Sequence, residues 1–551
     1  MTEIDQTDQK YACYLFEAKS IQQYLFSTNR LREIVGGSEM IENITGKDGL
    51  LDNLIKELDI NKKLVFSRKG GGAFYAFSEP ETIRKLKNAW SLLFQIAIPN
   101  MTFNHASAQA SGDFEAFESA QTKLLASRNR IMARMPQATP FTLRFNRTGE
   151  PAEKENKAKG KLEAVDSATH TKLKYAKRDA LLKRFDKNSK RKNWPVYLTP
   201  EPGKEKKNFP FNDDSQAVAL IHADGNGFGQ LLMTLKEQVK NNKDLHDNFI
   251  PLFADFSQAI STATENAAQT AVDTVLAPHK EQEVLYPARP IVLGGDDLTI
   301  IVRADLAIAF TQVFLNAFEA ESKKQLATLT KKYPLEGIPS KLTACAGITF
   351  AKASHPFHMM HDLSEALCSA AKMKSKSLRR EDGSKNKVVP SSLVFHRITT
   401  SLVDDYASIV KNELTAGGQI LTRGAYAIKP NDNLPHLDDL FELLACFDHK
   451  DSSSNALREI QSLLKNDKEE AETRYKRWLE VIEKDQSSFK QKYLELMDRL
   501  IETNKKNDSK EKTTHKAENF SAIKAWPLND LLSLKAVKAK PLHQQNQSEE
   551  K

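Results

Sequence analysis

The stretch that decides the fold runs from 290 to 302 and reads PIVLGGDDLTIIV. Two apolar segments flank Gly294, Gly295, Asp296 and Asp297, so the pattern predicts two strands joined by a tight turn. The glycines permit positive φ in that turn and leave space above it for a nucleotide. Because neighbouring strand residues point to opposite faces, we expect one aspartate to be a primary metal ligand and the other an auxiliary one. The sequence does not say which.

A third carboxylate, that of Asp224, follows the apolar run AVALIHA at 217–223, which is typical of a buried strand. In a split βαβ sheet the end of this strand lies beside the central hairpin, so the three carboxylates are expected at one edge. Hard divalent cations favour a few carboxylates plus substrate phosphate oxygens. Two Mg²⁺ or Mn²⁺ ions at such a site would serve an in-line displacement at phosphorus. We therefore predict Asp224, Asp296 and Asp297 as catalytic residues and metal ligands.

The elements around these residues follow the order strand, helix, strand, strand, helix, strand. This is the ferredoxin-like arrangement of an α+β domain. The sequence predicts strands at 217–223 and 342–351, the hairpin at 290–302, and helices at 228–240, 247–274, 303–326 and 356–373. Residues 11–110 repeat this order around a hairpin with Gly70, Gly71 and Gly72 at its tip and no acidic residue there. We interpret the repeat as a degenerate internal duplication.

The turn GNGFG at 225–229 adds a phosphate argument. Its glycines let the backbone approach a ligand closely, Asn226 is expected to cap the following helix, and the free N–H groups of that helix favour a triphosphate. Lys372, late in another helix, could neutralise the phosphates. The predicted nucleotide- and phosphate-binding residues are Gly225, Asn226, Gly227, Phe228, Gly229, Gly294, Gly295 and Lys372.

Each of these motifs has a plainer interpretation. Gly-Gly-Asp-Asp alone is compatible with an ordinary hairpin turn, since glycine and aspartate dominate turns. A lysine late in a helix, such as Lys372, also suits the helix dipole on a plain surface. The combination of the turn with Asp224 at a strand end, inside this order of elements, favours the catalytic interpretation.

The charge distribution separates an acidic body from two basic parts. The 551 residues hold 80 Lys and Arg against 72 Asp and Glu, a net charge of +8. Residues 153–207 carry a net charge of +9 and the tail from Thr503 carries +4, which leaves −5 for the rest. We interpret 153–207 as a solvated insertion with some helix at 170–186, where any RNA contact would map first.

Other compositional features exclude several classes of protein. No apolar run approaches the 18 residues of a membrane span, and the first ten residues are polar, so a membrane protein or a secreted one is not expected. The four cysteines are scattered singly, which excludes a four-cysteine zinc site and suits a reducing cytoplasm. We expect a cytoplasmic protein.

Several segments together resemble a known family. ADGNGFG (223–229), GGDD (294–297), ACAGITFA (344–351) and AAK (370–372) resemble the second palm domain of the large polymerase-like subunit of type III CRISPR effector complexes. FEAKSIQQYLFSTNRLREIVGGSEM (16–40) and SRKGGGAFYAF (67–77) resemble its first palm domain. The match covers roughly residues 11–145 and 215–500.

The resemblance implies a fold and an activity. That family's palm is related to GGDEF nucleotide cyclases, and its active members convert ATP into cyclic oligoadenylate messengers in antiviral defence. Asp224, Asp296 and Asp297 match the metal-binding acids, and Lys372 matches a lysine near the triphosphate. The first palm, without acids, is expected to bind nucleotide or to complete a composite site.

The chain also departs from the family. We expect no HD nuclease domain, because the resemblance to the first palm begins near the start of the sequence. FNRTGEPA (145–152) stands without cysteines where relatives often carry a zinc motif, so no zinc is expected. These differences leave the partners open: guide RNA and effector-complex subunits, or a homo-oligomer. The alternative function is a non-catalytic palm scaffold that binds RNA and partner proteins, and a weaker alternative is a template-dependent polymerase.

The expected domain organisation has five parts. They are a degenerate first palm at 1–145, a basic inter-palm insertion at 146–214, a second palm with the GGDD site at 215–430, a helical domain at 431–502 and a basic, mostly disordered tail at 503–551, in which 525–537 could dock as a short helix.

Overall fold

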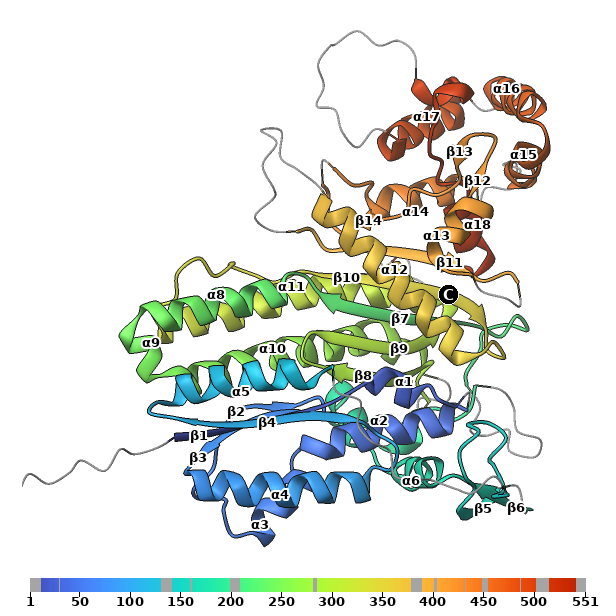
Figure 1. The fold of residues 1–551 in the computed structure, drawn as a ribbon. Coiled ribbons are helices and arrows are strands. Elements are labelled where there is room, and N and C mark those ends of the chain that lie inside the picture. Colours follow the sequence, from blue (N-terminus) through green and yellow to red (C-terminus); the bar gives the residue numbers. More distant parts are fainter. Residues whose placement is uncertain are drawn as a thin grey trace, which may run out of the picture.

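Two β-sheets dominate the computed structural model, one in the N-terminal part (blue in Figure 1) and one in the middle of the chain (green to orange). The structure describes residues 11–28, 30–129, 141–158, 161–198, 209–280, 285–377, 389–400, 404–431, 433–447, 454–485, 487–501 and 515–541. Helices α5 (Asp113–Ser127) and α10 (Phe249–Ala271) lie between the sheets. The Phe249 ring is 5.0 Å from that of Phe114 and 5.1 Å from that of Phe117. The two sheet domains therefore share an apolar interface.

The first domain has the ferredoxin-like topology that the sequence predicted. Its antiparallel sheet has the strand order β2-β3-β1-β4. The strands are β1 (Tyr11–Ala18), β2 (Val65–Gly70), β3 (Ala73–Ser78) and β4 (Phe103–Ala110). The helices besides α5 are α1 (Ile21–Leu25), α2 (Leu31–Thr45), α3 (Leu50–Glu57) and α4 (Pro80–Ala97).

The second domain repeats this topology and extends it. Its sheet has the order β14-β11-β10-β7-β9-β8, in which β10-β7-β9-β8 corresponds to β4-β1-β3-β2 of the first. The strands are β7 (Ala217–Gly225), β8 (Ala288–Gly294), β9 (Asp297–Arg303), β10 (Ala344–Lys352), β11 (Ser392–Arg397) and β14 (Tyr426–Ala427). The helices besides α10 are α8 (Phe228–Asn241), α9 (Lys243–Asp247), α11 (Ala307–Lys332) and α12 (Phe357–Ser377). The predicted α+β class with two ferredoxin-like domains is confirmed.

Strand β7 is apolar throughout because both of its faces are covered. Ala219 and Ile221 belong to the core that contains α10 and α11, whereas Val218 and Leu220 belong to the core shared with the first domain. This alternation follows from the two-residue period of a strand. It explains why AVALIHA is a continuous apolar run, as in sheets buried on both sides.

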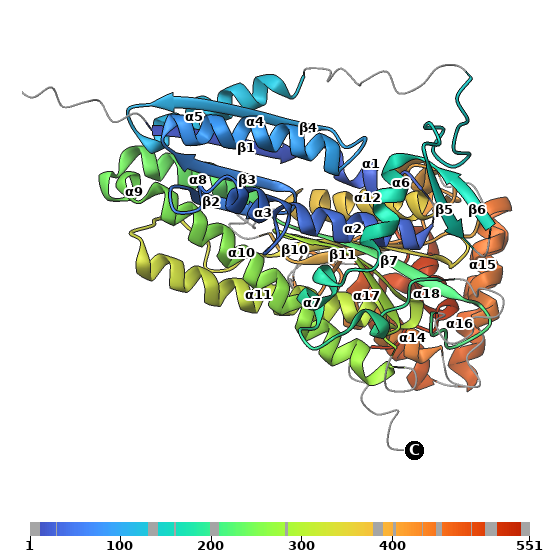
Figure 2. The ribbon, with the colours of Figure 1, turned by 90° about the horizontal axis from the view of Figure 1, so that it is seen from below.

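The inter-domain segment differs from the solvated insertion that we expected. It forms a hairpin of β5 (Lys154–Ala158) and β6 (Lys161–Val165) and two short helices, α6 (Ser167–Tyr175) and α7 (Ala180–Phe185). Figure 2 shows α6 against α2. The helix predicted at 170–186 is present as α6 and α7, but the predicted solvated character was wrong, because apolar residues are interspersed among the lysines and enter the cores. The buried ones include Val165, Leu181, Leu182, Phe185 and Trp194.

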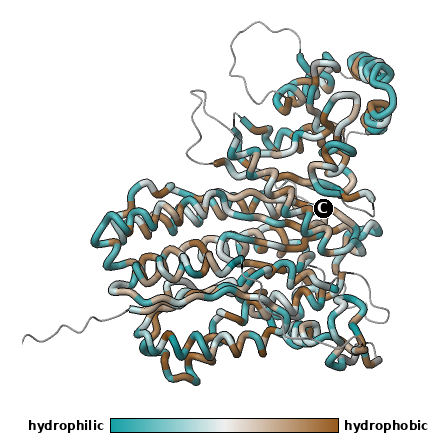
Figure 3. The backbone as a smooth tube through the Cα atoms, in the orientation of Figure 1, coloured by the Kyte–Doolittle hydropathy of each residue, from teal (hydrophilic) through white to brown (hydrophobic). Residues whose placement is uncertain are grey.

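The C-terminal region is helical, as predicted, but its last part is more ordered than we expected. Its elements are α13 (Tyr406–Asn412), β12 (Thr415–Ala416), β13 (Gln419–Ile420), α14 (Leu437–Cys446), α15 (Ser454–Asn466), α16 (Lys468–Asp485), α17 (Ser487–Ile501) and α18 (Leu528–Ala536). In Figure 3 the helices at the upper right, α15 and α16, are mostly polar on the outside. Among the described helices, none is long and apolar enough to cross a membrane.

The tail was expected to be mostly disordered apart from a short helix at 525–537. That helix is present as α18, and the ordered part is longer than expected, since residues 515–541 fold onto the helical domain. Phe520 and Trp526 are buried, and α18 presents Asp530 to the second sheet domain. The carboxylate of Asp530 accepts hydrogen bonds from the Tyr426 hydroxyl (2.6 Å) and the Arg423 backbone N–H (2.9 Å). The aromatic and leucine residues within the basic composition account for this correction. Residues 502–514 and 542–551 lie outside the described part of the chain.

Candidate active site

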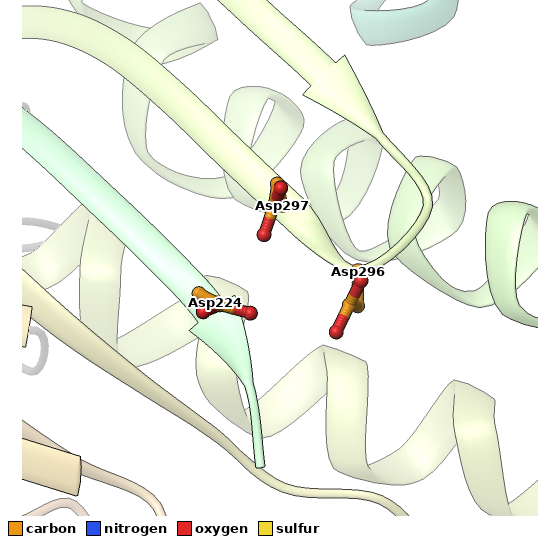
Figure 4. A group of neighbouring side chains, drawn as sticks. All are labelled: Asp224, Asp296 and Asp297. Carbon is orange, nitrogen blue, oxygen red and sulfur yellow. The ribbon is translucent and has the colours of Figure 1, made fainter. Parts of the chain in front are cut away.

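The three predicted carboxylates meet at one edge of the second sheet. Asp224 lies at the end of β7, Asp297 at the start of β9, and Asp296 on the turn between β8 and β9. Ala223 pairs with Leu298 across the two strands, so Asp224 and Asp297 are cross-strand neighbours on the same face. One carboxylate oxygen from each of the three lies within 4.8 Å of the others (Figure 4).

The electrostatics of this group suit a cation. All three aspartates are half-buried. Burial raises the pKa of Asp297 well above its ordinary value, and the neighbouring charges of Asp296 and Asp224 raise it further. A divalent cation would remove that repulsion, and three oxygen ligands leave room in its coordination shell for phosphate oxygens. The residues present therefore fit Mg²⁺ or Mn²⁺.

Lys372 reaches the site from helix α12. Its ammonium group donates hydrogen bonds to the Asp224 carboxylate and to the Gly225 carbonyl oxygen, the latter at 2.9 Å. Burial lowers the pKa of Lys372, but the hydrogen bond and charge of Asp224 outweigh it, so the pKa lies above its ordinary value. Helix α12 can lie this close to β10 because residue 347 is glycine: a Cβ there would come well inside 3.0 Å of the Ser364 carbonyl oxygen.

The glycines around the acids are of two kinds. A Cβ at Gly225 would lie 2.7 Å from a carboxylate oxygen of Asp296, so this glycine makes room for a ligand residue. Gly227 and Gly295 have positive φ values of 75° and 54°. Among the residues that the structure describes, nothing lies within 4 Å of a Cβ built at Gly227, Gly229, Gly294 or Gly295. These four positions therefore border open space, as close approach of a phosphate requires.

Asn226 does not play the part that the sequence predicted. Its side chain is buried and donates a hydrogen bond to the Thr343 hydroxyl (3.1 Å), while Gly227 occupies the N-cap position of α8 without a side-chain cap. The backbone of Asn226 also donates to the Thr343 carbonyl oxygen (2.8 Å). Asn226 therefore fixes the turn to the loop before β10. A side chain bonded to Thr343 in this way does not cap α8. Phe228 stacks on Phe256 of α10, with ring centroids 5.8 Å apart.

A cavity of about 610 Å³ adjoins the acids and is lined by both sheet domains. Gly294, Gly295, Asp296 and Asp297 border it on one side, and Gly70 and Gly71 of the first hairpin on the other. On the first-domain side Lys69 forms an ion pair with Asp52. The cavity is thus composite, which agrees with the expectation that the first hairpin helps to form the site without adding acids at its tip.

Comparison with known proteins identifies the domain that carries the acids. Residues 217–381 match the family described as Cas10/Cmr2, second palm domain. This segment is similar to the Cas10/Cmr2 second palm domain. The resemblance to the large palm subunit of type III effector complexes is thereby confirmed. No curated protein matches the chain.

Solved structures also resemble the chain, at low sequence identity. A Csm1–Csm4 cassette in complex with cA4 has 12% identity and a TM-score of 0.44, and the match covers 86% of this chain and 65% of that one. The cassette with cA3 has 12% identity and a TM-score of 0.47, covering 98% and 71%. Csm1 in T. onnurineus has 11% identity and a TM-score of 0.47, covering 96% and 69%. This chain therefore spans about two thirds of the length of those Csm1 chains.

Two residues that hold the second-palm turn were not singled out from the sequence. The Thr264 hydroxyl donates to the Gly295 carbonyl oxygen (2.6 Å), and the Arg184 guanidinium donates to the Leu293 carbonyl oxygen (2.6 Å). Thr264 is one of several threonines in α10, and Arg184 is one of many basic residues in the inter-palm segment. Neither has a sequence signal, because their partners lie 31 and 109 residues away.

Proposed function

We propose that this chain is a metal-dependent nucleotidyltransferase that makes a cyclic oligonucleotide messenger, with ATP as the preferred substrate, in antiviral defence of the type III CRISPR kind. The observation that carries the proposal is the meeting of Asp224, Asp296 and Asp297 beside open glycine turns in a second palm domain. The adjoining cavity has the size class of small-molecule sites.

The proposed reaction is a phosphoryl transfer between two nucleotides. A ribose hydroxyl oxygen of one nucleotide attacks the α-phosphorus of another triphosphate, forming a new P–O bond. The bond from that phosphorus to the oxygen bridging to the β-phosphate breaks, and pyrophosphate leaves with the electron pair. The hydroxyl proton passes to solvent. Repetition of this step lengthens the oligonucleotide, and the same step between its two ends closes the ring.

The residues of the chain divide the work. Asp224, Asp296 and Asp297 would hold two Mg²⁺ or Mn²⁺ ions, which when bound supply charge neutralisation at the phosphates and a more acidic hydroxyl. Lys372 holds the Asp224 carboxylate in place and adds a positive charge to a site rich in acids. The backbone at 227–229 and 294–295 leaves the space that the triphosphate needs.

The test is incubation of the purified full chain with each nucleoside triphosphate and Mg²⁺ or Mn²⁺, with and without guide and target RNA. We expect pyrophosphate release and a cyclic product by mass spectrometry, with ATP preferred. Asp297→Asn should lower the rate by about 100-fold or more. Asp247→Asn, whose side chain is 61% exposed, serves as the matched control and should not lower it. Absence of product under all these conditions would contradict the proposal.

A measurement of RNA affinity, added to this assay, separates an enzyme from a scaffold. Guide RNA and effector-complex subunits are the proposed partners, and the basic inter-palm segment is the part where RNA contacts are expected. A salt-sensitive RNA affinity that survives Asp296→Ala and Asp297→Ala, together with absence of any nucleotide product, would instead favour a non-catalytic palm scaffold.

A further inference from the structure

Arg184 connects the inter-palm segment to the second-palm turn. It lies near the end of helix α7, its side chain is 17% exposed, and it borders the composite cavity. The main chain of Arg184 is held as well, because the Gln269 side-chain amide donates a hydrogen bond to the Arg184 carbonyl oxygen (2.9 Å). An arginine that borders a candidate nucleotide cavity invites the interpretation of a phosphate ligand.

The hydrogen bonds of Arg184 argue against that interpretation. Its Nε donates to the Glu265 carboxylate (2.9 Å), and its Nη1 donates to the Glu42 carboxylate (2.9 Å) and to the Leu293 carbonyl oxygen (2.6 Å). Its Nη2 lies 2.9 Å from Glu265 and donates to the Ser261 hydroxyl (3.4 Å). A guanidinium group has five N–H donors, and four of them donate hydrogen bonds to protein groups, while Nη2 also forms an ion pair with Glu265. Protein groups therefore engage most of the Arg184 donors, which favours a structural role over that of a phosphate ligand.

The partners of Arg184 belong to three different elements. Glu42 is on helix α2 of the first palm, and Glu265 is on helix α10 of the second. Leu293 is the residue directly before Gly294, Gly295, Asp296 and Asp297. One side chain from the inter-palm segment therefore joins a first-palm helix to the strand end that leads into the acidic turn.

Helix α10 holds the other side of the same turn. The Thr264 hydroxyl is fully buried and donates to the Gly295 carbonyl oxygen (2.6 Å). The residues Ser261, Thr264 and Glu265 share one helical face, because they are three and four positions apart. The turn is thus held at two main-chain oxygens, at Gly295 directly by α10 and at Leu293 through Arg184.

We propose that Arg184 is a positioning residue that holds the GGDD turn at a fixed place relative to the first palm, through Glu42, Glu265 and the Leu293 carbonyl oxygen. Its planar fork presents five donors on three nitrogens in a fixed geometry, whereas a lysine offers three donors on one nitrogen. The placement of Asp296 and Asp297, and with it the affinity of the site for divalent cations, depends on Glu42 in the other palm. The cation-binding part of this inference rests on the proposed function.

The first test measures the turn itself by hydrogen–deuterium exchange of the full chain, followed in peptides that cover 290–300. Arg184→Lys and Glu42→Gln should each speed exchange in these peptides by about tenfold, because each removes part of the anchor. Peptides from β10 should exchange as in the unsubstituted protein. Arg178→Lys is the control, since Arg178 lies in the same segment and its side chain makes, among the interactions of the described residues, only a cation–π contact with the Tyr175 ring. Unchanged exchange at 290–300 in both variants, or an equal rise throughout the chain, would overturn the proposal.

The second test measures binding of Mn²⁺ alone, by the electron paramagnetic resonance signal of the free ion. Arg184→Lys and Glu42→Gln should weaken Mn²⁺ binding by about tenfold, and the double variant should be no weaker than Arg184→Lys, because both act on one anchor. Additive losses would overturn the proposed coupling. If the unsubstituted chain binds Mn²⁺ but makes no nucleotide product, the proposed function fails while the positioning role is still decided by these affinities and by the exchange rates.

Discussion

At the scale of single residues, the site is shaped as much by missing side chains as by the acids. Gly225 follows Asp224 directly, and its lack of a Cβ is what lets Asp296 fold back toward Asp224. The sequence argument gave this glycine a role in phosphate approach. The structure adds a second role, which is to admit a neighbouring carboxylate.

Gly225→Ala should therefore damage the site without unfolding the domain. The new methyl group would meet the Asp296 carboxylate at 2.7 Å and displace it, so we expect Mn²⁺ affinity to fall by about tenfold or more. The measurement is a Mn²⁺ titration, with the thermal midpoint as the check on folding. Gly229→Ala is the matched control, because nothing described lies within 4 Å of a Cβ there. That control should keep its Mn²⁺ affinity; an equal loss in both variants would contradict the explanation.

The residues that the sequence could predict are those whose role is visible in local pattern. Asp224, Asp296 and Asp297 stand at strand ends next to glycines, and the split βαβ order of the strands places those ends at one edge of the sheet. Arg184 and Asn226 show the limit of this reasoning. Their partners come from distant segments, so a basic run suggested solvent for Arg184 and a turn asparagine suggested a cap for Asn226. Only the packing of α7 and of the loop before β10 decides their roles.

At the scale of elements, the inter-palm segment acts as a structural part of both palms. Helix α6 packs on α2 at Gly36 and Gly37, where a Cβ at Gly36 would come well inside 3.0 Å of the Lys172 carbonyl oxygen. Lys172 is itself buried, and its ammonium group donates to the Ser27 hydroxyl (3.0 Å) and to the Tyr24 carbonyl oxygen. Burial lowers the pKa of Lys172 to about 8. A lysine-rich composition predicted a surface, but a lysine with oxygen partners can be buried.

Gly36→Ala tests this helix contact. Alanine normally favours a helix over glycine by about 1 kcal/mol, so a destabilisation here has to come from the packing. We expect the free energy of unfolding to fall by about 1–3 kcal/mol, because the obstacle is backbone and both helices must move apart. Urea unfolding followed by circular dichroism measures it. Gly229→Ala, in another helix and open on its Cβ side, should instead be neutral or stabilising. A stable Gly36→Ala variant would show that α6 does not pack on α2 in this way.

At the scale of the whole molecule, the two basic parts of the chain connect its domains, which the net charge of +8 alone does not indicate. The inter-palm segment joins the palms through Arg184, and residues 515–541 of the basic tail join the helical domain to the second palm through α18. Asp530 on α18 is 2% exposed and accepts hydrogen bonds from Tyr426, Arg423 and Thr422. The composition of the tail predicted disorder because net charge is high there. The buried aromatic residues explain why residues 515–541 are nevertheless ordered, since they add enough apolar area to offset the conformational entropy that ordering costs.

We expect Asp530 to make this connection dependent on pH. Burial raises the pKa of Asp530 from 3.8 to about 6, although its hydrogen bonds act in the opposite direction. Because the folded-state pKa lies above the unfolded value, the folded protein binds the proton more tightly. The contribution to stability is fully present below about pH 4 and is lost as the pH rises through about 6. Burial also raises the pKa of Glu39, to about 7, so the unsubstituted chain alone does not isolate this effect.

Comparison of the chain with its Asp530→Asn variant isolates the contribution of Asp530 to stability, because the contribution of Glu39 is the same in both proteins. Asparagine keeps the size and one oxygen acceptor of aspartate but cannot ionise. Between pH 4 and pH 7 we expect the stability difference to shift in favour of the variant by about 3 kcal/mol, which corresponds to a pKa change of about two units. Urea unfolding of both proteins at steps across that range measures it, with the tryptophan fluorescence of the chain as the signal. A difference that is constant with pH would mean that Asp530 stays ionised in the folded protein and that its three hydrogen bonds, rather than burial, set its pKa.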